Sequence, residues 1–306
     1  MGDDLLIIGG GPAGLTAGIY GARAGFDVTI LEKSMPGGYM GTVDYIENYP
    51  GFPSGIRGYD LAELMKKQAQ RFNVKIIGTE VIGLDRDREM IAIKTDSSDF
   101  RSMAVIVATG TSPKQIGVPG EEKLRGRGVS YCATCDGPLY KNKKIAVIGC
   151  GNSGLQEGRF LLSFVEKIVF VEILPHMTAE AILQQAFDGE TRVEFLLRHQ
   201  LTNINGDQRV ESITVKDLTT GKKDDIKIDG VFVYAGLVPA SGFLKGFVDL
   251  DQHGFIITNS QLQTSVPGIF AAGDIRSGSR RQVITACGQG AEAALNAYHY
   301  VETMNK

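Results

Sequence analysis

The residues of this chain best suited to chemistry are two cysteines in the segment Cys132-Ala-Thr-Cys135-Asp136. Two thiols separated by two residues interconvert between a dithiol and a disulfide, because each thiol is a nearby resolving partner for the other. The pair lies between two glycine-rich segments of a nucleotide-binding type, Gly9–Gly14 and Gly149–Gly154. This arrangement predicts that electrons pass between a bound cofactor and a disulfide.

The two glycine-rich segments are copies of one pattern. In the first copy an apolar stretch leads into the glycines and a second apolar stretch ends at Glu32; the same order recurs from Ile145 and ends at Glu172. A strand, a glycine turn, a helix, a second strand and an acid about 20 residues further on make up the dinucleotide fingerprint. One copy is weak evidence, but two matched copies predict two Rossmann-like units. The glycines that let the backbone approach a pyrophosphate are Gly9, Gly11 and Gly14 in the first copy and Gly149, Gly151 and Gly154 in the second.

The composition is that of an ordinary globular protein. The chain has 306 residues, which suggests about two domains, with 43% hydrophobic and 22% charged residues. A net charge of −3 gives no electrostatic footprint for nucleic acid or an anionic membrane, and no apolar run approaches the roughly 20 residues of a membrane helix. The first predicted strand begins at Leu5, which leaves no room for a signal or transit peptide. We therefore expect a cytoplasmic protein without a nucleic acid or membrane partner.

The remaining cysteines do not predict a metal site. Cys150 lies in the second glycine turn and Cys287 in a stretch of small residues, and neither belongs to a second close pair. The four histidines are dispersed. Structural zinc sites need closely spaced ligand pairs, so no metal is expected. The sequence assigns no role to Cys150 or Cys287.

The order of the motifs predicts that one nucleotide-binding domain is inserted in another. The expected fold class is α/β, with two Rossmann-like three-layer domains. Proline and glycine mark linkers near residues 111–120 and 237–240. The expected domains are therefore a discontinuous one, 1–114 plus 241–306, and an inserted one, 115–240, which carries the dithiol.

Local patterns predict several elements. Helices are expected over Pro12–Ala24, where proline occupies the first turn, and from about Gln282 to Glu302. A hairpin is expected over residues 209–228. One amphipathic helix is predicted by a core-facing stripe of Leu61, Leu64, Met65, Ala69 and Phe72.

Taken together and in this order, the motifs closely resemble those of the low-molecular-weight FAD-dependent thioredoxin reductases. The resemblance covers essentially the whole chain. It is carried by Gly9–Gly14, Glu47–Gly51, Ala108–Gly110, Tyr131–Gly137, Gly273-Asp274 and Arg281–Val283. It implies FAD in the discontinuous domain, a redox dithiol in the inserted domain, a homodimer, and a rotation between the domains.

The resemblance also implies which residues bind FAD. They are Gly9, Gly11, Pro12, Ala13, Gly14, Glu32, Lys33, Gly38, Asn48, Ala108, Gly110, Gly273, Asp274, Arg281, Gln282 and Val283. Glu32 would accept the hydroxyls of the adenosine ribose, and Asp274 would hold the ribityl or phosphate arm. The positive end of the last helix would face the pyrimidine edge of the flavin.

Catalytic roles follow from the same resemblance. Cys135 would take electrons from the flavin, and Cys132 would attack the substrate disulfide to form a mixed disulfide. Asp136 would move the proton to or from the leaving thiolate. The implied substrate is thioredoxin or a glutaredoxin-like protein, since a thioredoxin potential of about −270 mV is within reach of a reduced flavin dithiol.

The chain departs from this family at the expected donor site. Members that use NADPH carry a His-Arg-Arg stretch after the second strand of the inserted domain, which clamps the 2′-phosphate. Here the strand continues as Glu172-Ile-Leu-Pro-His176, without an arginine before Arg192. Glu172 would repel a 2′-phosphate, so NADPH is disfavoured. NADH, reduced ferredoxin and reduced deazaflavin stay open as donors, and Gly149, Gly151, Gly154 and Glu172 form either a second nucleotide site or only a scaffold.

Other functions remain as alternatives. A flavin-dependent dithiol oxidase has a similar layout but passes electrons from dithiols to oxygen. A type-2 ferredoxin–NADP reductase shares the domain order but has no use for Cys132 and Cys135. Glutathione-reductase-type enzymes carry their cysteines early, and no such pair occurs in residues 1–113. A redox-sensing flavoprotein has no dedicated sequence feature.

Overall fold

The computed structural model describes residues 3–304, which form two compact units. Unit 1 comprises the described chain up to Ser112 and from Val238 onward, and unit 2 comprises Pro113–Leu237. Where the chain passes from one unit to the other, the short strands β7 (Thr111–Pro113) and β16 (Leu237–Pro239) pair with each other. Unit 2 is thus inserted in unit 1, and the expected fold class is confirmed.

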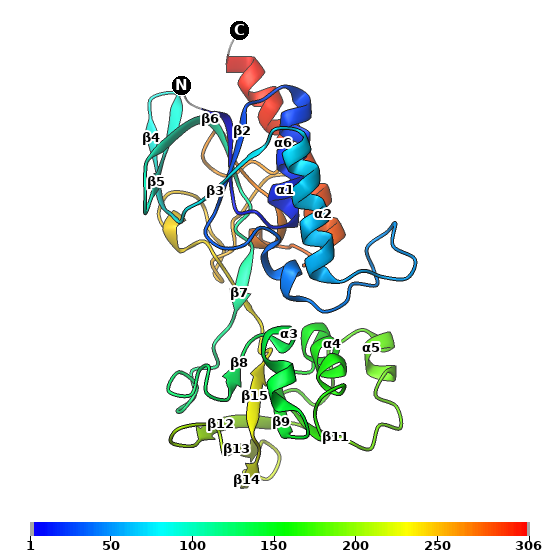
Figure 1. Cartoon of the computed structure of the whole chain (residues 1–306). Coiled ribbons are helices and arrows are strands. Elements are labelled where there is room, and N and C mark those ends of the chain that lie inside the picture. Colours follow the sequence, from blue (N-terminus) through cyan, green and yellow to red (C-terminus); the bar gives the residue numbers. More distant parts are fainter. Residues whose placement is uncertain (1–2, 305–306) are drawn as a thin grey trace. The chain divides into compact units, whose positions relative to one another are not determined.

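The sheet of unit 1 combines a parallel part with an antiparallel extension (Figure 1). Its order is β3-β2-β1-β6-β5-β4, and β17 also pairs with β6. The parallel strands are β1 (Asp3–Ile8), β2 (Val28–Glu32), β3 (Lys75–Gly78), β6 (Phe100–Val107) and β17 (Ile269–Ala271). The strands β4 (Val81–Asp87) and β5 (Met90–Thr95) are antiparallel and had no expected counterpart. Leu5, Leu6 and Ile7 are fully buried, as both faces of a covered parallel sheet require.

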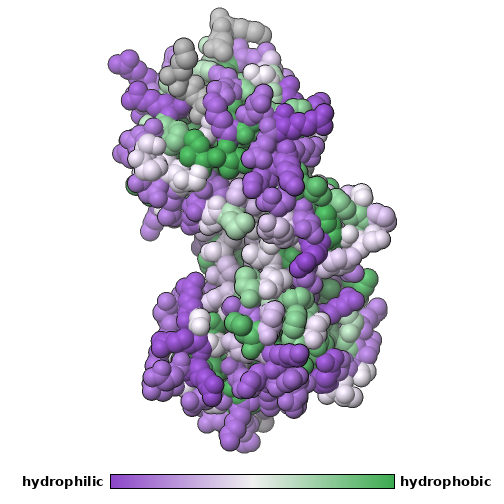
Figure 2. Space-filling model, in the orientation of Figure 1, coloured by the Kyte–Doolittle hydropathy of each residue, from purple (hydrophilic) through white to green (hydrophobic). Residues whose placement is uncertain are grey.

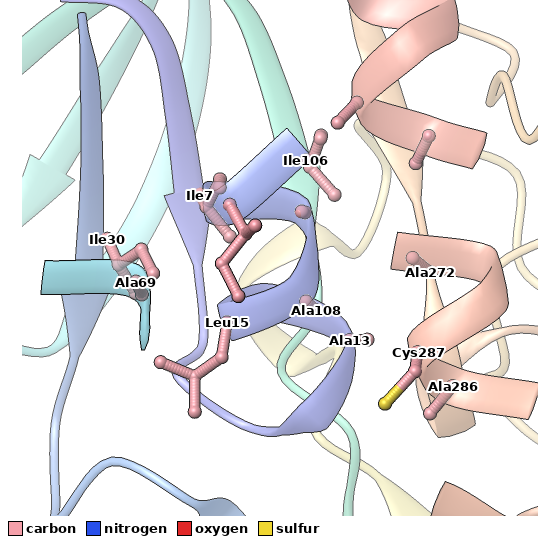
Figure 3. Packing of buried hydrophobic residues seen from close by; sticks show 14 of the residues in the cluster. Ile7, Ala13, Leu15, Ile30, Ala69, Ile106, Ala108, Ala272, Ala286 and Cys287 are labelled. Carbon is pink, nitrogen blue, oxygen red and sulfur yellow. The ribbon is translucent and has the colours of Figure 1, made fainter. Parts of the chain in front are cut away.

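Three long helices belong to unit 1. They are α1 (Pro12–Ala24), α2 (Gly58–Arg71) and α6 (Val283–Met304). The helices α1 and α6 pack so closely that a Cβ at Gly290 would overlap the backbone oxygen of Ala13. Figure 3 shows Ala13 on the side of α1 that faces α6, with Cys287 of α6 pointing toward α1. Three short 3-10 helices each begin with a glycine: η1 (Gly38–Thr42), η3 (Gly242–Leu244) and η4 (Gly273–Ile275).

The predicted stripe on α2 was wrong at one position. Leu64 is half exposed, whereas Ala62 is buried with Leu61 and Met65. Successive helical residues are about 100° apart, so Leu64 lies more than a quarter turn from the middle of the buried face while Ala62 lies within it. The small side chain of Ala62 gave a weaker apolar signal than the leucine.

Unit 2 contains a parallel sheet and a separate antiparallel one (Figure 1). The parallel sheet has the order β11-β10-β9-β15-β8, with strands β8 (Val129–Ser130), β9 (Lys144–Ile148), β10 (Lys167–Glu172), β11 (Val193–Leu197) and β15 (Gly230–Val233). The antiparallel sheet consists of β12 (His199–Asn205), β13 (Ser212–Asp217) and β14 (Lys223–Lys227), and its β13–β14 pair confirms the predicted hairpin. The helical elements are α3 (Ala133–Asp136), η2 (Gly137–Tyr140), α4 (Asn152–Leu161) and α5 (Ala181–Gln185).

The helices within residues 3–304 include no candidate membrane span. None of the helices described there is both long and apolar enough to cross a membrane. On the face shown in Figure 2, hydrophilic residues predominate and hydrophobic ones form separate small areas.

Candidate active site

The first glycine turn connects β1 to α1 and has room for a ligand at one defined point. Gly9 has φ +104°, and a Cβ there would overlap the carbonyl group of Ala108. A Cβ at Gly14 would overlap the oxygen of Gly9, whereas a Cβ at Gly11 would meet no atom within 4 Å. No side chain caps the N-terminus of α1, and Pro12 begins the helix. The open space at Gly11 thus lies at a helix N-terminus, where a pyrophosphate is favourably bound.

Segments far apart in the sequence meet at this turn. Ala108 follows β6, and Gly273, with φ +80°, is the first residue of η4. A Cβ at Gly273 would lie 2.9 Å from the side chain of Ala13, and one at Gly38 would lie 3.3 Å from the Cα of Gly11. The structure therefore brings these five predicted FAD residues to one edge of the sheet, at the carboxyl ends of parallel strands.

Glu32 fixes the loop beside this turn. Its Oε2 accepts a hydrogen bond from the backbone N–H of Gly10 at 2.6 Å, and its Oε1 accepts one from Ser34 at 2.8 Å. Lys33 forms an exposed ion pair with Glu80, 3.1 Å between Nζ and Oε1. These side chains line a cleft whose other residues include Gly9, Thr79, Val81, Thr109 and Phe243. Each carboxylate oxygen of Glu32 keeps a lone pair for a ribose hydroxyl.

Three further predicted residues, Asn48, Arg281 and Gln282, lie beside the start of α6. The side chain of Asn48 donates to Oε1 of Gln282 at 3.0 Å, which joins two motifs distant in the sequence. Gln282 precedes the helix, and its carbonyl accepts the first helical hydrogen bond, from Ala286. Arg281 has φ +56°, and its guanidinium lies 5.2 Å from the ring centroid of Phe255. The helix was expected from about Gln282, and α6 begins one residue later, at Val283. Arg281 lies before the helix, because its left-handed backbone cannot join it.

Burial raises the pKa of two side chains in unit 1, Asp274 and Tyr49. Burial raises the pKa of Asp274, while Ser279 and Arg281 oppose that rise. Tyr49, whose hydroxyl lies 3.8 Å from the sulfur of Cys287, has its pKa raised to about 12, first by burial and then by that thiol. Tyr49 and Cys287 were not among the predicted site residues.

Cys132 and Cys135 of unit 2 form a disulfide at the start of α3. The sulfur of Cys132 accepts a hydrogen bond from the backbone N–H of Cys135 at 3.2 Å, and Oγ1 of Thr134 lies 3.3 Å from it. Cys135 is exposed and Cys132 is half-buried. The sulfur of Cys132 therefore lies among donors, which favour a thiolate once the disulfide opens.

Asp136 is held by a residue that the motifs did not single out. Oγ of Ser130 donates to Oδ2 of Asp136 at 2.6 Å and accepts from the backbone N–H of Cys132 at 3.1 Å. The hydroxyl of Tyr234 accepts from the N–H of Ala133 at 3.0 Å. Both residues follow from the topology, since Ser130 ends β8 and Tyr234 follows the neighbouring strand β15, so the carboxyl ends of these parallel strands meet at the dithiol.

The second glycine turn repeats the geometry of the first. Gly149 has φ +108°, and a Cβ at Gly154 would overlap the oxygen of Gly149. Oε2 of Glu172 accepts from the N–H of Cys150 at 2.8 Å, and its Oε1 accepts from Leu174 at 3.0 Å. Cys150 is fully buried, and burial, followed by the charge of Glu172, raises its pKa to about 12.

The segment after β10, residues 173–180, crosses this turn without a lysine or an arginine. The backbone N–H of Thr178 donates to the oxygen of Cys150 at 3.1 Å, and a Cβ at Gly151 would lie 3.5 Å from Oγ1 of Thr178. Ile173 and Leu174 are exposed to solvent. Arg192, the next arginine in the sequence, pairs with Glu190 at 2.7 Å. Arg198 lies nearer in space than the sequence suggested, because its backbone N–H donates to the oxygen of Leu174 at 3.0 Å.

Comparisons with known proteins agree with this geometry over nearly the whole chain. Residues 3–290 match the family model for pyridine nucleotide-disulphide oxidoreductases. The chain belongs to the pyridine nucleotide-disulphide oxidoreductase family. Within that family it is 41% identical to the thioredoxin reductase of Bacillus subtilis (strain 168), over 99% of this chain and 96% of the relative.

Solved structures of this family have the same fold. The thioredoxin reductase of Lactococcus lactis in the FR conformation has a TM-score of 0.96 at 36% identity, covering 98% of this chain and 99% of that chain. The thioredoxin reductase of T. acidophilum has a TM-score of 0.94 at 38% identity, covering 99% of each chain. The resemblance to the low-molecular-weight thioredoxin reductases is confirmed.

Proposed function

We propose that this chain is an FAD-dependent thioredoxin reductase that passes electrons through Cys132 and Cys135 to the disulfide of thioredoxin or a similar protein. The observation that carries the proposal is the Cys132–Cys135 disulfide, with hydrogen-bond donors around one sulfur and a carboxyl group in the next residue. The thioredoxin reductases named above support it, because they align with this chain over nearly their full length.

FAD fits the first glycine turn. Its pyrophosphate would occupy the open space at Gly11, and Glu32 would hold the adenosine ribose beside the cleft. The remaining predicted residues, among them Pro12, Lys33, Asn48, Gly110, Asp274 and Val283, keep their proposed places around it. When bound, FAD supplies the electron pair for the dithiol. The N-terminus of α6, next to the Asn48–Gln282 hydrogen bond, would favour negative charge in its neighbourhood.

The two sulfurs have different surroundings, which supports different roles. Donors from Cys135 N–H and Thr134 favour the thiolate of Cys132, the form that attacks a disulfide. Attack forms a mixed disulfide between Cys132 and the substrate. Cys135 then attacks the sulfur of Cys132, which releases the reduced substrate and restores the disulfide.

Asp136 supports both proton transfers of this exchange. Its protonated carboxyl gives a proton to the first sulfur that leaves the substrate. The resulting carboxylate takes the proton of Cys135 as that sulfur attacks Cys132, and passes it to the second leaving sulfur. Two protons and two electrons thus move from the dithiol unit to the substrate disulfide.

NADPH is the disfavoured donor. Glu172 lies where a 2′-phosphate would approach, and Ile173 and Leu174 occupy the positions of the clamping arginines of NADPH-using members. NADH, reduced ferredoxin and reduced deazaflavin remain as donors. A Michaelis constant for NADPH in the low micromolar range would contradict this part of the proposal.

The experiment is an anaerobic titration of the purified protein with NADPH, NADH, reduced ferredoxin and reduced deazaflavin. We expect a yellow protein whose flavin absorbance bleaches with at least one donor other than NADPH, followed by reduction of added thioredoxin. We expect the active protein to be a homodimer, and sedimentation of the same sample measures its mass in solution. A colourless protein that retains no FAD, or peroxide production from dithiols without thioredoxin turnover, would contradict the proposal.

A further inference from the structure

A buried serine lies between the sheet of unit 2 and the dithiol. Ser130 is 3% exposed and ends β8, where its backbone pairs with Phe232 of β15. Its position is therefore fixed by the sheet rather than by the short helix α3. The disulfide follows two residues later, so Ser130 is the last sheet residue before the reacting sulfurs.

The hydrogen bonds of Ser130 give its hydroxyl one orientation. Oγ accepts from the N–H of Cys132 at 3.1 Å, so its own proton points elsewhere. Two acceptors are within reach, the carbonyl of Cys132 at 3.2 Å and Oδ2 of Asp136 at 2.6 Å. The shorter bond to the carboxyl group is the stronger one, because bonds to ionised acceptors are shorter and stronger than neutral ones.

We infer that Ser130 is a positioning residue for the proton transfer that Asp136 performs. Its hydroxyl occupies Oδ2 in both protonation states, so the transferred proton is carried on Oδ1. Oγ of Ser130 also accepts a hydrogen bond from the backbone N–H of Cys132. The two hydrogen bonds of Ser130 therefore hold the carboxyl group of Asp136 in a fixed position relative to Cys132. Without this donor, the carboxylate formed after each transfer loses a hydrogen bond, and its rotation is no longer restricted.

The inference rests on the proposed role of Asp136 and predicts a dependence on the substrate's leaving group. An aliphatic thiolate is a poor leaving group and needs a proton, whereas an aromatic nitrothiolate leaves readily without one. Ser130→Ala should therefore slow reduction of oxidised thioredoxin and cystamine by about tenfold, with little change for dithiobis(nitrobenzoate). Loss of packing alone would slow all three alike.

The experiment measures single-turnover reduction of these three disulfides by the pre-reduced holoenzyme. The variants are Ser130→Ala, Ser130→Thr, Asp136→Asn and the double variant S130A/D136N. Ser130→Thr retains a hydroxyl and should recover most of the rate. If Ser130 acts through Asp136, the double variant should be no slower than Asp136→Asn alone, since two groups acting as a unit are not additive.

A matched control separates folding from catalysis. Ser102 is another fully buried serine, and its Oγ donates to the carbonyl of Ala104 at 2.7 Å in unit 1. Ser102→Ala should leave all three rates unchanged. If Ser130→Ala fails to fold, Ser130→Cys and Ser130→Thr carry the same comparison.

The outcomes separate the inference from the proposed function. Wild-type rates for Asp136→Asn would remove the proposed acid, whereas an impaired Asp136→Asn with a normal Ser130→Ala would overturn only the inference. Equal slowing of the aromatic and aliphatic disulfides, or additive effects in the double variant, would also overturn it. No disulfide reduction by the wild-type holoenzyme would instead count against the proposed function.

Discussion

The two glycine turns of this molecule share a backbone and differ in what crosses over it. In both, the first glycine has a positive φ, +104° at Gly9 and +108° at Gly149. In both, an acid at the end of the next strand bonds the turn and the following loop. The returning segment donates to the same position in each, from Gly37 to Gly10 and from Thr178 to Cys150.

The crossing segments account for the difference between the turns. Over the first turn the chain returns as Gly37-Gly38, which leaves the space at Gly11 open. Over the second it returns with Thr178, and the side chain of Asn152 bonds both the N–H and the carboxylate of Glu180, at 2.8 and 3.0 Å. The two turns have the same backbone, so we expect the segments that cross them to decide which nucleotide, if any, each turn binds.

The largest expected effect concerns a feature that only unit 2 has. Cys135→Ser should lower thioredoxin turnover by about a thousandfold or more, because the mixed disulfide loses its resolving thiol. FAD content should be unchanged, since no predicted FAD residue is altered. Turnover assays and the absorbance of the bound flavin measure the two quantities. Loss of FAD in this variant would contradict the assignment of FAD to unit 1.

Matched glycine variants test the difference between the two turns directly. Gly11→Ala should fold normally but lose most bound FAD, because its Cβ enters open space that the pyrophosphate would fill. Gly151→Ala should fold and retain FAD, so it serves as the paired control. Gly14→Ala should destabilise unit 1 by about 3 kcal/mol or more, because its Cβ overlaps backbone. Flavin absorbance and thermal unfolding measure these effects, and full FAD occupancy in Gly11→Ala would argue against the proposed cradle.

Donor specificity gives the next effect in size. The triple variant E172H/I173R/L174R should lower the Michaelis constant for NADPH by about tenfold or more, through two cations placed for the 2′-phosphate. The Michaelis constant for NADH, if NADH is a donor, should not fall in parallel. Arg198→Ala serves as a control for the arginine beside Leu174. Tight use of NADPH by the parent, lost in Arg198→Ala, would show that Arg198 replaces the missing clamp.

The smallest effect distinguishes the cysteine in the second turn from the dithiol. Burial raises the pKa of Cys150 from 9.0 to about 12, so the folded protein holds its proton more tightly than the unfolded chain. Any stabilisation from this shift is complete below about pH 9 and is lost as the pH rises toward 12. At pH 8 the reduced protein should incorporate iodoacetamide at Cys132 and Cys135, with Cys150 labelled only after unfolding. Peptide mass spectrometry measures this, and comparable labelling of Cys150 in the native protein would contradict it.

The sequence predicted the elements with strong local signals. Gly9, Gly14, Gly149 and Gly154 stand where the backbone leaves no room for another side chain, so residue type alone marked both turns. The bounds of α1 and the β13–β14 hairpin followed in the same way from proline, glycine and apolar period. Cys132, Cys135 and Asp136 were predicted as a group because they are close in the sequence.

Only the tertiary structure placed residues whose partners are distant in the sequence. The pairing of Asn48 with Gln282 and the approach of Tyr234 to Ala133 depend on which strands are neighbours. Leu64 is exposed and Ala62 is buried because burial depends on the direction of a helix face, not on apolarity alone. Nothing in the sequence indicated a role for Ser130, because a serine near the end of a strand is common. Its role arises because parallel pairing of β8 with β15 fixes its hydroxyl beside Asp136.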